Sequence, residues 1–223
     1  MKRLILCVVF ACVSGAALFA AETTESIKIG QESVSLKVFN PEKDNLPVVI
    51  LVHGARGVRG LRAARYDGYG NELMSNNIIG IIVHYFDAKS VNWEESIAEA
   101  VNFAERLPNA AKARIGMIGY STGATLALKL ASRDSRIKLL VLDTMFLPAG
   151  FSKSDAASLP KTFIMCGSQD KVLSDMLTLR EWLSASGVPF QERITQGQGP
   201  KSASVETYDA DWQAALKFFK DNL

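Results

Sequence analysis

The order of apolar and polar residues along the chain predicts buried strands that alternate with amphipathic helices. Five short runs are continuously apolar and rich in β-branched residues, which is typical of strands covered on both faces. These runs are residues 48–52, 78–83, 115–118, 139–142 and 162–165. Segments with helical periodicity lie between or after them, at residues 63–76, 93–106, 121–132, 174–186 and 209–222.

This alternation indicates an α/β fold with a mostly parallel central sheet and helices on both faces. Residues 26–29 and 34–39 add an expected antiparallel hairpin at one edge. The longest irregular stretch after the N-terminal segment, residues 146–160, is too short for a lid domain. We therefore expect one domain over residues 22–223.

The N-terminal segment has the pattern of a secretory signal peptide. Residues 1–3 carry two cations, residues 4–21 carry no charge, and small residues precede a cleavage site near Ala20 or Ala21. An uncleaved membrane anchor and lipid attachment at Cys12 remain alternatives. Cleavage of residues 1–21 predicts an exported protein, periplasmic or secreted, that keeps no membrane span.

Composition and charge narrow the class of protein. A content of 48% hydrophobic and 22% charged residues is ordinary for a folded globular domain. The chain has 25 basic and 23 acidic residues. Removal of the signal peptide takes away Lys2 and Arg3, so the mature chain has equal numbers of basic and acidic residues. This balance argues against a nucleic-acid partner. Cleavage also leaves Cys166 as the sole cysteine, so no intramolecular disulfide is expected.

Residues 119–123 read G-x-S-x-G between a predicted strand and a predicted helix. In this context the motif forms a sharp, strained turn that exposes the serine hydroxyl above the sheet, and the glycines avoid collisions there. We therefore expect Ser121 to be a nucleophile. The N–H of Thr122, at the start of the helix, is the expected donor to a developing oxyanion.

The strand at residues 48–52 is followed by a loop that begins His53-Gly54. A loop of this kind donates the second N–H to the oxyanion, and here the expected donor is Ala55. His53 in such a loop is more often a structural hydrogen-bonding residue than a base. Arg56, with Arg59 and Arg62, is placed to receive a carboxylate, although solvated surface arginines are the commoner explanation.

An acid is expected after the strand at residues 162–165, where Asp170 stands. That position fits the chain order Ser, Asp, His of α/β-hydrolases. A helix N-cap role for Asp170 is compatible with this assignment. Asp143, at the end of the preceding strand, is the alternative acid.

These motifs, with His84-Tyr85-Phe86-Asp87 and the closing helix at residues 212–219, resemble the dienelactone hydrolase family over nearly the whole mature chain. The resemblance implies hydrolysis of small carboxylic esters or lactones without a metal or an organic cofactor. It also implies a serine or cysteine nucleophile that works with His and Asp. His84, Tyr85 and Tyr120 are further candidates to line the pocket.

The chain departs from that family at the histidine. The family places it after the last strand in a Gly-x-Gly-His-like turn, whereas residues 196–201 have Pro200 at that position. The chain has only two histidines, His53 and His84, and both precede Ser121. His84 ends a strand expected two sheet spacings of ~4.8 Å from the strand of Ser121, so direct hydrogen bonding is not expected.

Two hypotheses follow. One is an ester or lactone hydrolase that uses Ser121 without the usual histidine. The other is a catalytically inactive pseudoenzyme that binds a small ester, lactone or carboxylate in the same pocket. A purely structural role is a third class, which no feature of the sequence favours. The substrate and the oligomeric state stay open at this point.

Overall fold

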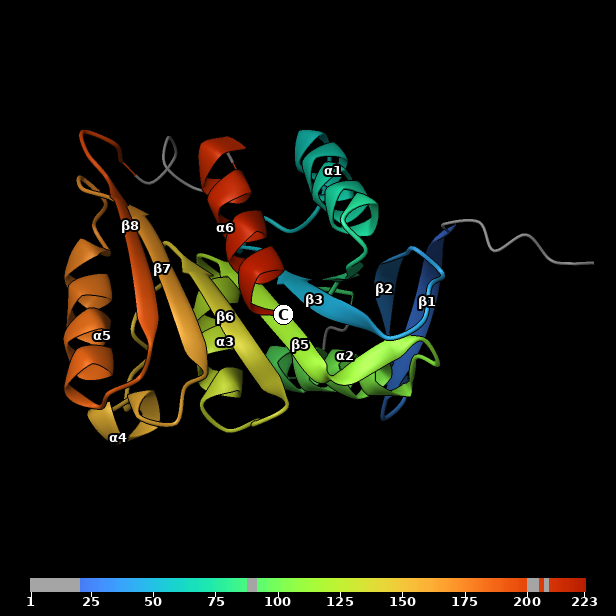
Figure 1. Ribbon diagram of the computed structural model, residues 1–223, viewed down its shortest axis with the longest axis horizontal. Coiled ribbons are helices and arrows are strands. Elements are labelled where there is room, and N and C mark those ends of the chain that lie inside the picture. Colours follow the sequence, from blue (N-terminus) through green and yellow to red (C-terminus); the bar gives the residue numbers. More distant parts are fainter. Residues whose placement is uncertain (1–20, 88–91, 200–204, 207–208) are drawn as a thin grey trace, which may run out of the picture.

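The computed structural model of the protein describes residues 21–87, 92–199, 205–206 and 209–223. Within them the chain forms one mixed eight-stranded sheet with helices on both faces (Figure 1). The predicted signal peptide lies outside the described residues except for Ala21, and Pro200 lies outside them as well.

The sheet has the strand order β1-β2-β4-β3-β5-β6-β7-β8. Strands β3 to β8 run parallel, whereas β1 pairs antiparallel with β2 and β2 pairs antiparallel with β4. The strands are β1 Ala21–Ile29, β2 Glu32–Asn40, β3 Leu46–Val52, β4 Ile79–Val83, β5 Ala110–Tyr120, β6 Ile137–Asp143, β7 Lys161–Gly167 and β8 Phe190–Thr195. The predicted α/β class, parallel core and edge hairpin are thus confirmed.

Helices cover both faces, as the continuous apolarity of the inner strands requires. Side chains of α1 and α6 pack in one apolar cluster, while those of α2, α3 and α5 pack in a second cluster on the opposite face. The helices are α1 Leu61–Ser75, α2 Trp93–Arg106, α3 Thr122–Ala131, α4 Lys153–Ala156, α5 Leu173–Ala185 and α6 Asp209–Asn222. Among the described residues, every helix is too short or too polar to cross a bilayer.

Several elements differ from the expected ones. Strand β5 begins five residues before the predicted 115–118, and β8 is not among the five predicted runs. Strand β1 begins five residues before the predicted 26–29, because its pairing with β2 satisfies the backbone although most of its side chains stay exposed. Helix α4 lies inside the stretch expected to be irregular. It is a single turn that Ser152 and Asp155 hold through a reciprocal capping box.

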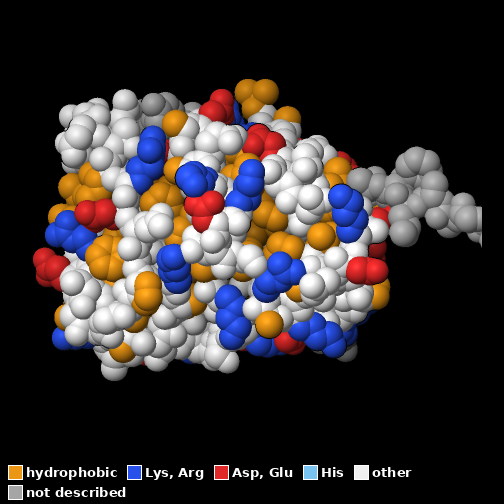
Figure 2. All heavy atoms as spheres, in the orientation of Figure 1, with side chains coloured by type: hydrophobic (Ala, Val, Ile, Leu, Met, Phe, Trp, Pro, Cys, Tyr) orange, Lys and Arg blue, Asp and Glu red, His pale blue; other side chains and the backbone are white. Residues whose placement is uncertain are grey.

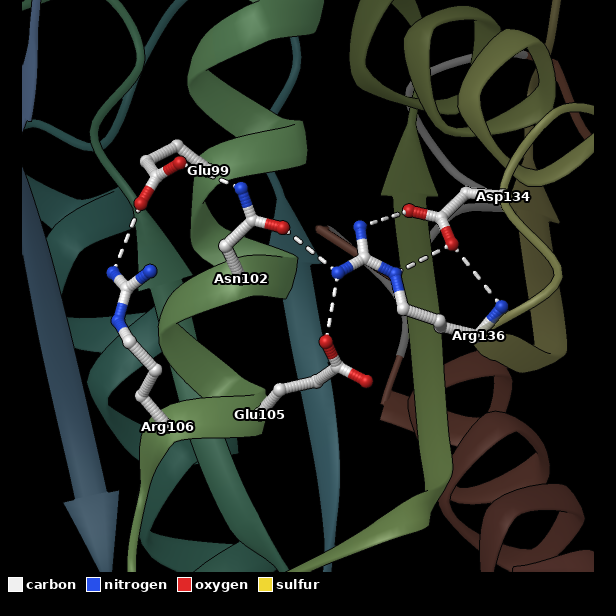
Figure 3. A network of polar contacts seen from close by, with 6 residues as sticks. All are labelled: Glu99, Asn102, Glu105, Arg106, Asp134 and Arg136. Atoms are coloured by element: carbon white, nitrogen blue, oxygen red, sulfur yellow. Dashed lines mark hydrogen bonds and ion pairs between the residues drawn. The ribbon is translucent and has the colours of Figure 1, made fainter.

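Polar contacts fasten α2 to the turn that leads into β6 (Figure 3). Arg136 donates to both carboxylate oxygens of Asp134, at 2.8 and 2.6 Å. It also donates to Glu105 at 2.8 Å and to Asn102 at 2.7 Å on α2. This network is partly buried and holds α2 against the start of β6. The other end of β6, at Asp143, lies next to the candidate site.

Candidate active site

Ser121 stands at the sharp turn between β5 and α3. Its backbone has φ 52° and ψ −120°, a left-handed conformation that costs free energy for a non-glycine residue. A Cβ at Gly119 would lie 2.5 Å from the Cα of Ala124, and one at Gly123 would lie 2.3 Å from the carbonyl oxygen of Val52. Both glycines are therefore required for the close approach of α3 to the ends of β3 and β5.

The described part of the chain forms a cavity of about 370 Å³ over this turn. That volume lies in the range of small-molecule sites, which is roughly 300–1,000 Å³. Its lining residues come from the loops after β3, β5, β6 and β7, from α1, and from the segment after β8. They are Ala55, Arg56, Arg62, Tyr120, Ser121, Thr144, Phe146, Asp170, Lys171 and Glu206.

Several predicted site residues therefore meet at one place. Ser121, Ala55, Asp170, Arg56 and Tyr120 all border the cavity. Thr122 is the first residue of α3, so its N–H has no acceptor within the helix. The roles assigned to these residues remain predictions.

The carboxylate of Asp170 has one oxygen engaged and one without a partner. Its Oδ1 accepts a hydrogen bond from the N–H of Val172 at 3.1 Å. The N-cap of α5 is Val172 and has no side-chain capping bond, so the N-cap role considered for Asp170 is wrong. The Oδ2 of Asp170 is buried and has no hydrogen-bond partner among the described residues. A buried oxygen of this kind is unusual, and it marks a position where a donor is expected.

The loop after β8 runs beside Asp170. The N–H of Gln169 donates to the carbonyl oxygen of Gln198 at 2.9 Å, and that of Gly197 donates to Ser168 Oγ at 2.9 Å. The loop that carries the histidine in the dienelactone hydrolase pattern is thus next to the candidate acid over its described part.

Asp143, the alternative acid, is fully buried at the end of β6 and does not line the cavity. Burial raises the pKa of its carboxyl group well above the ordinary value. The Thr144 hydroxyl donates to its Oδ1 at 3.0 Å, and its Oδ2 accepts from the N–H of Val205. Its backbone carbonyl accepts from the N–H of Ser121 at 2.9 Å. The geometry suits a residue that holds the neighbouring segments together.

The histidines lie away from the cavity lining. His53 is buried, stacks on Tyr85 with ring centroids 4.1 Å apart, and donates from Nδ1 to the carbonyl oxygen of Gly54 at 2.9 Å. Burial lowers the pKa of His53 to about 4. Tyr85 donates its hydroxyl to the carbonyl oxygen of His53 at 2.6 Å, and burial also lowers the pKa of His84. These contacts make His53 and Tyr85 supports of the loop after β3.

Charged side chains of both signs border the cavity, and sequence reasoning missed two of them, Lys171 and Glu206. Arg56, Arg62 and Lys171 line it, as do Asp170 and Glu206, whereas Arg59 is exposed and not among the lining residues. Glu206 follows a polar loop in which no motif singles it out. The face seen in Figure 2 likewise mixes Lys, Arg, Asp and Glu with apolar and neutral side chains. No group of three or more His, Cys, Asp or Glu residues forms a potential metal site in the part of the chain that is described.

Comparison with known families adds a partial match. Residues 95–147 match the family described as BAAT / Acyl-CoA thioester hydrolase C terminal. The matched stretch includes the turn at Ser121 and ends after β6. No curated protein is close enough in sequence to count as a relative.

Solved structures resemble the whole described fold. A protein from Bacteroides ovatus assigned as dipeptidyl aminopeptidase IV is 17% identical with a TM-score of 0.77; the match covers 94% of this chain and 37% of that one. An esterase from Rhizomucor miehei is 17% identical with a TM-score of 0.75, covering 91% and 84%. A protein from Klebsiella pneumoniae assigned as a dienelactone hydrolase is 17% identical with a TM-score of 0.73, covering 89% and 98%. The chain therefore has the α/β-hydrolase fold, and it spans little more than a third of the peptidase.

Proposed function

We propose that this α/β-hydrolase-fold protein hydrolyses small carboxylic esters or lactones, with Ser121 as the nucleophile. The observation that carries the proposal is the left-handed backbone of Ser121 at a strand-to-helix turn on the edge of a cavity. Strain of this kind persists only where the surrounding structure enforces it, and it is concentrated at functional sites. The esterase and dienelactone hydrolase among the structural neighbours support the same reaction class.

In the proposed reaction, Ser121 Oγ attacks the carbonyl carbon of the ester and forms a tetrahedral intermediate. The N–H groups of Ala55 and Thr122 stabilise its oxyanion, an effect worth roughly 10²–10³ in kcat per donor. Collapse of the intermediate expels the alcohol and leaves an acyl group on Ser121. Water then releases the acid and regenerates the serine.

The cavity favours a small substrate that carries a negative charge. Arg56, Arg62 and Lys171 border it, and guanidinium groups bind carboxylates through paired hydrogen bonds. Arg56→Ala is expected to raise KM for an ester with a free carboxylate and to leave KM for a neutral ester nearly unchanged. Arg59→Ala is the matched control, because that arginine is exposed and not among the lining residues. An equal effect on both esters would refute the carboxylate preference.

A second candidate function is ligand binding without turnover. The motivating observations are Pro200 in the expected place of histidine and the buried Oδ2 of Asp170, which has no hydrogen-bond partner in the described part of the chain. Loss of the triad base costs about a millionfold in kcat in a well-studied serine protease. This candidate predicts that small carboxylates raise the melting temperature without being consumed.

The deciding experiment is hydrolysis of short p-nitrophenyl esters by the purified protein, with Ser121→Ala as the reference. Turnover that the substitution abolishes supports the hydrolase. Equal rates for the two proteins would refute it and leave ligand-induced stabilisation as the test of the binding candidate. A fluorophosphonate probe adds an independent readout, because it labels an activated serine even when deacylation is slow.

We further propose that the protein is exported after removal of residues 1–21. The support is the charge and hydrophobicity pattern of that segment. Expression of the full chain, followed by cell fractionation and N-terminal sequencing, tests it. A cytoplasmic product that retains Met1 would overturn the proposal.

A further inference from the structure

The segment Val205–Glu206 crosses the end of the strand that carries Ser121. Strand β5 lies between β3 and β6 in the sheet. On the β6 side, the carboxylate of Asp143 accepts the N–H of Val205, while the Tyr69 hydroxyl donates to the carbonyl oxygen of Val205. These two bonds hold the segment beside the end of β6, where the backbone carbonyl oxygen of Asp143 accepts the N–H of Ser121.

On the β3 side, the Glu206 carboxylate lies near Tyr66 and the backbone of Gly54. The Tyr66 hydroxyl donates to Oε1 at 2.9 Å, and the backbone of Gly54 lowers the pKa of the carboxyl group. Gly54 follows β3 and precedes the candidate oxyanion donor Ala55. The backbone of the segment is therefore fixed at β6 and its carboxylate at β3, so Glu206 extends over the end of β5 and borders the same cavity as Ser121.

We propose that Glu206 is the proton acceptor for Ser121, in place of the histidine that this chain lacks. The inference rests on the proposed function and names a catalytic residue for it. Asp170 is a weaker candidate, because it follows β7, two sheet spacings of ~4.8 Å from β5, and has a shorter side chain. Glu206 is the other acidic residue among the described lining residues.

A single carboxylate, that of Glu206, can accept and return every proton that the reaction moves. As Ser121 Oγ bonds to the ester carbonyl carbon, its proton passes to Glu206 and the carbonyl π electrons move to the oxyanion. The neutral acid then protonates the departing alkoxide as the C–O bond breaks. In deacylation Glu206 takes a proton from water, the water oxygen attacks the acyl carbon, and the proton returns to Ser121 Oγ as it leaves.

The surroundings of Glu206 suit this role. Burial raises the pKa of its carboxyl group above the ordinary value, while the Tyr66 and Gly54 hydrogen bonds and the charges of Arg62 and Arg56 oppose the rise. A carboxylate with a raised pKa is a stronger base, and the ideal value lies near the working pH. The charged and titratable groups on the elements around it are Arg56, Arg62, Tyr66, Tyr69, Tyr85, Asp143, Asp170 and Lys171.

The test compares Glu206→Gln with the wild type and with Ser121→Ala on a p-nitrophenyl ester, whose leaving group needs no proton. The amide oxygen can still accept from Tyr66, so the fold is expected to survive. We expect kcat/KM to fall by about 10²- to 10⁴-fold. Glu192→Gln is the matched control, because Glu192 lies on β8 in an ion pair with Arg180 and away from the cavity.

Two further readouts separate a base from a structural residue. In Glu206→Ala, added formate is expected to restore part of the rate, with no such rescue in Ser121→Ala. The wild-type kcat/KM is expected to fall as the pH drops through the raised pKa, because protonation removes the base. The residual rate of Glu206→Gln is expected to lack this fall.

The outcomes distinguish the two proposals. An active wild type, an inactive Ser121→Ala and a Glu206→Gln within about threefold of wild type would overturn the role of Glu206 and leave the hydrolase standing. A wild type no faster than Ser121→Ala would overturn both proposals. A folded but slow Glu206→Gln without formate rescue of Glu206→Ala, and with an unchanged pH profile, would assign Glu206 a structural role and overturn the inference.

Discussion

Replacing Gly123 with alanine tests the packing that holds the strained serine in place. The added Cβ would lie 2.3 Å from the carbonyl oxygen of Val52 and 2.4 Å from that of His53. Ordinary C···O contacts are about 3.3 Å or longer, so the shortfall is roughly 1 Å. Both oxygens belong to the backbone at the end of β3, which cannot rotate away, and α3 must therefore shift.

The expected cost follows from these distances. Overpacking a well-packed site typically costs about 1–3 kcal/mol and occasionally more, and a backbone collision belongs at the upper end. For a domain of this size each kcal/mol corresponds to a change of about 2–4 °C in melting temperature. Gly123→Ala is therefore expected to lower the melting temperature by about 6–12 °C.

Gly68→Ala supplies a matched control with the opposite sign. Gly68 lies inside α1, and a Cβ there would meet nothing within 4 Å. Alanine in a helix interior is favoured over glycine by about 1 kcal/mol, so the melting temperature is expected to rise by about 2–4 °C. Thermal unfolding followed by circular dichroism measures both variants. Shifts of the same sign, or a Gly123→Ala variant within 2 °C of wild type, would refute the reasoning.

Three more results are expected. Pro200→His puts an imidazole two residues after Gln198, whose carbonyl oxygen bonds the N–H of Gln169 next to Asp170. This variant is expected to hydrolyse esters about 10²-fold faster or more. A folded variant with an unchanged rate would count against Asp170 as the acid. Burial raises the pKa of Asp143, so the folded state holds that proton more tightly than the unfolded state does. This stabilisation is complete below the ordinary pKa and is lost as the pH rises through the folded value. Asp143→Asn keeps an acceptor for the N–H of Val205 but has no carboxyl proton to lose. The melting temperature of this variant minus that of the wild type is therefore expected to rise between about pH 4 and pH 9. A difference in melting temperature that does not change with pH would contradict the argument. Burial raises the pKa of the Cys166 thiol to about 12, so iodoacetamide is expected to label it only after unfolding, and rapid labelling of the native protein would disprove this.

The core of the fold could be read from local patterns. Each inner strand is continuously apolar because both its faces are covered, and helix α2 occupies the predicted residues 93–106. The G-x-S-x-G motif located the turn at Ser121, because only glycine permits the close approaches on either side of it. The number of histidines is likewise a property of the sequence. Both histidines of the sequence precede Ser121, so a histidine at the position of the dienelactone hydrolase pattern is not expected.

The composition of the cavity depended on the tertiary structure. Arg56 and Arg62 border the cavity and Arg59 does not, although all three lie in one short segment. Glu206 belongs to no motif, and the bonds of Val205 to Asp143 and Tyr69 and of Glu206 to Tyr66 bring it to the cavity. Hydrophobic periodicity reports which face of an element is buried, but the path of a polar loop is set by contacts with residues far away in the sequence. For this reason Ser121 could be proposed as the nucleophile from the sequence, whereas its proposed proton acceptor emerged only from the folded chain.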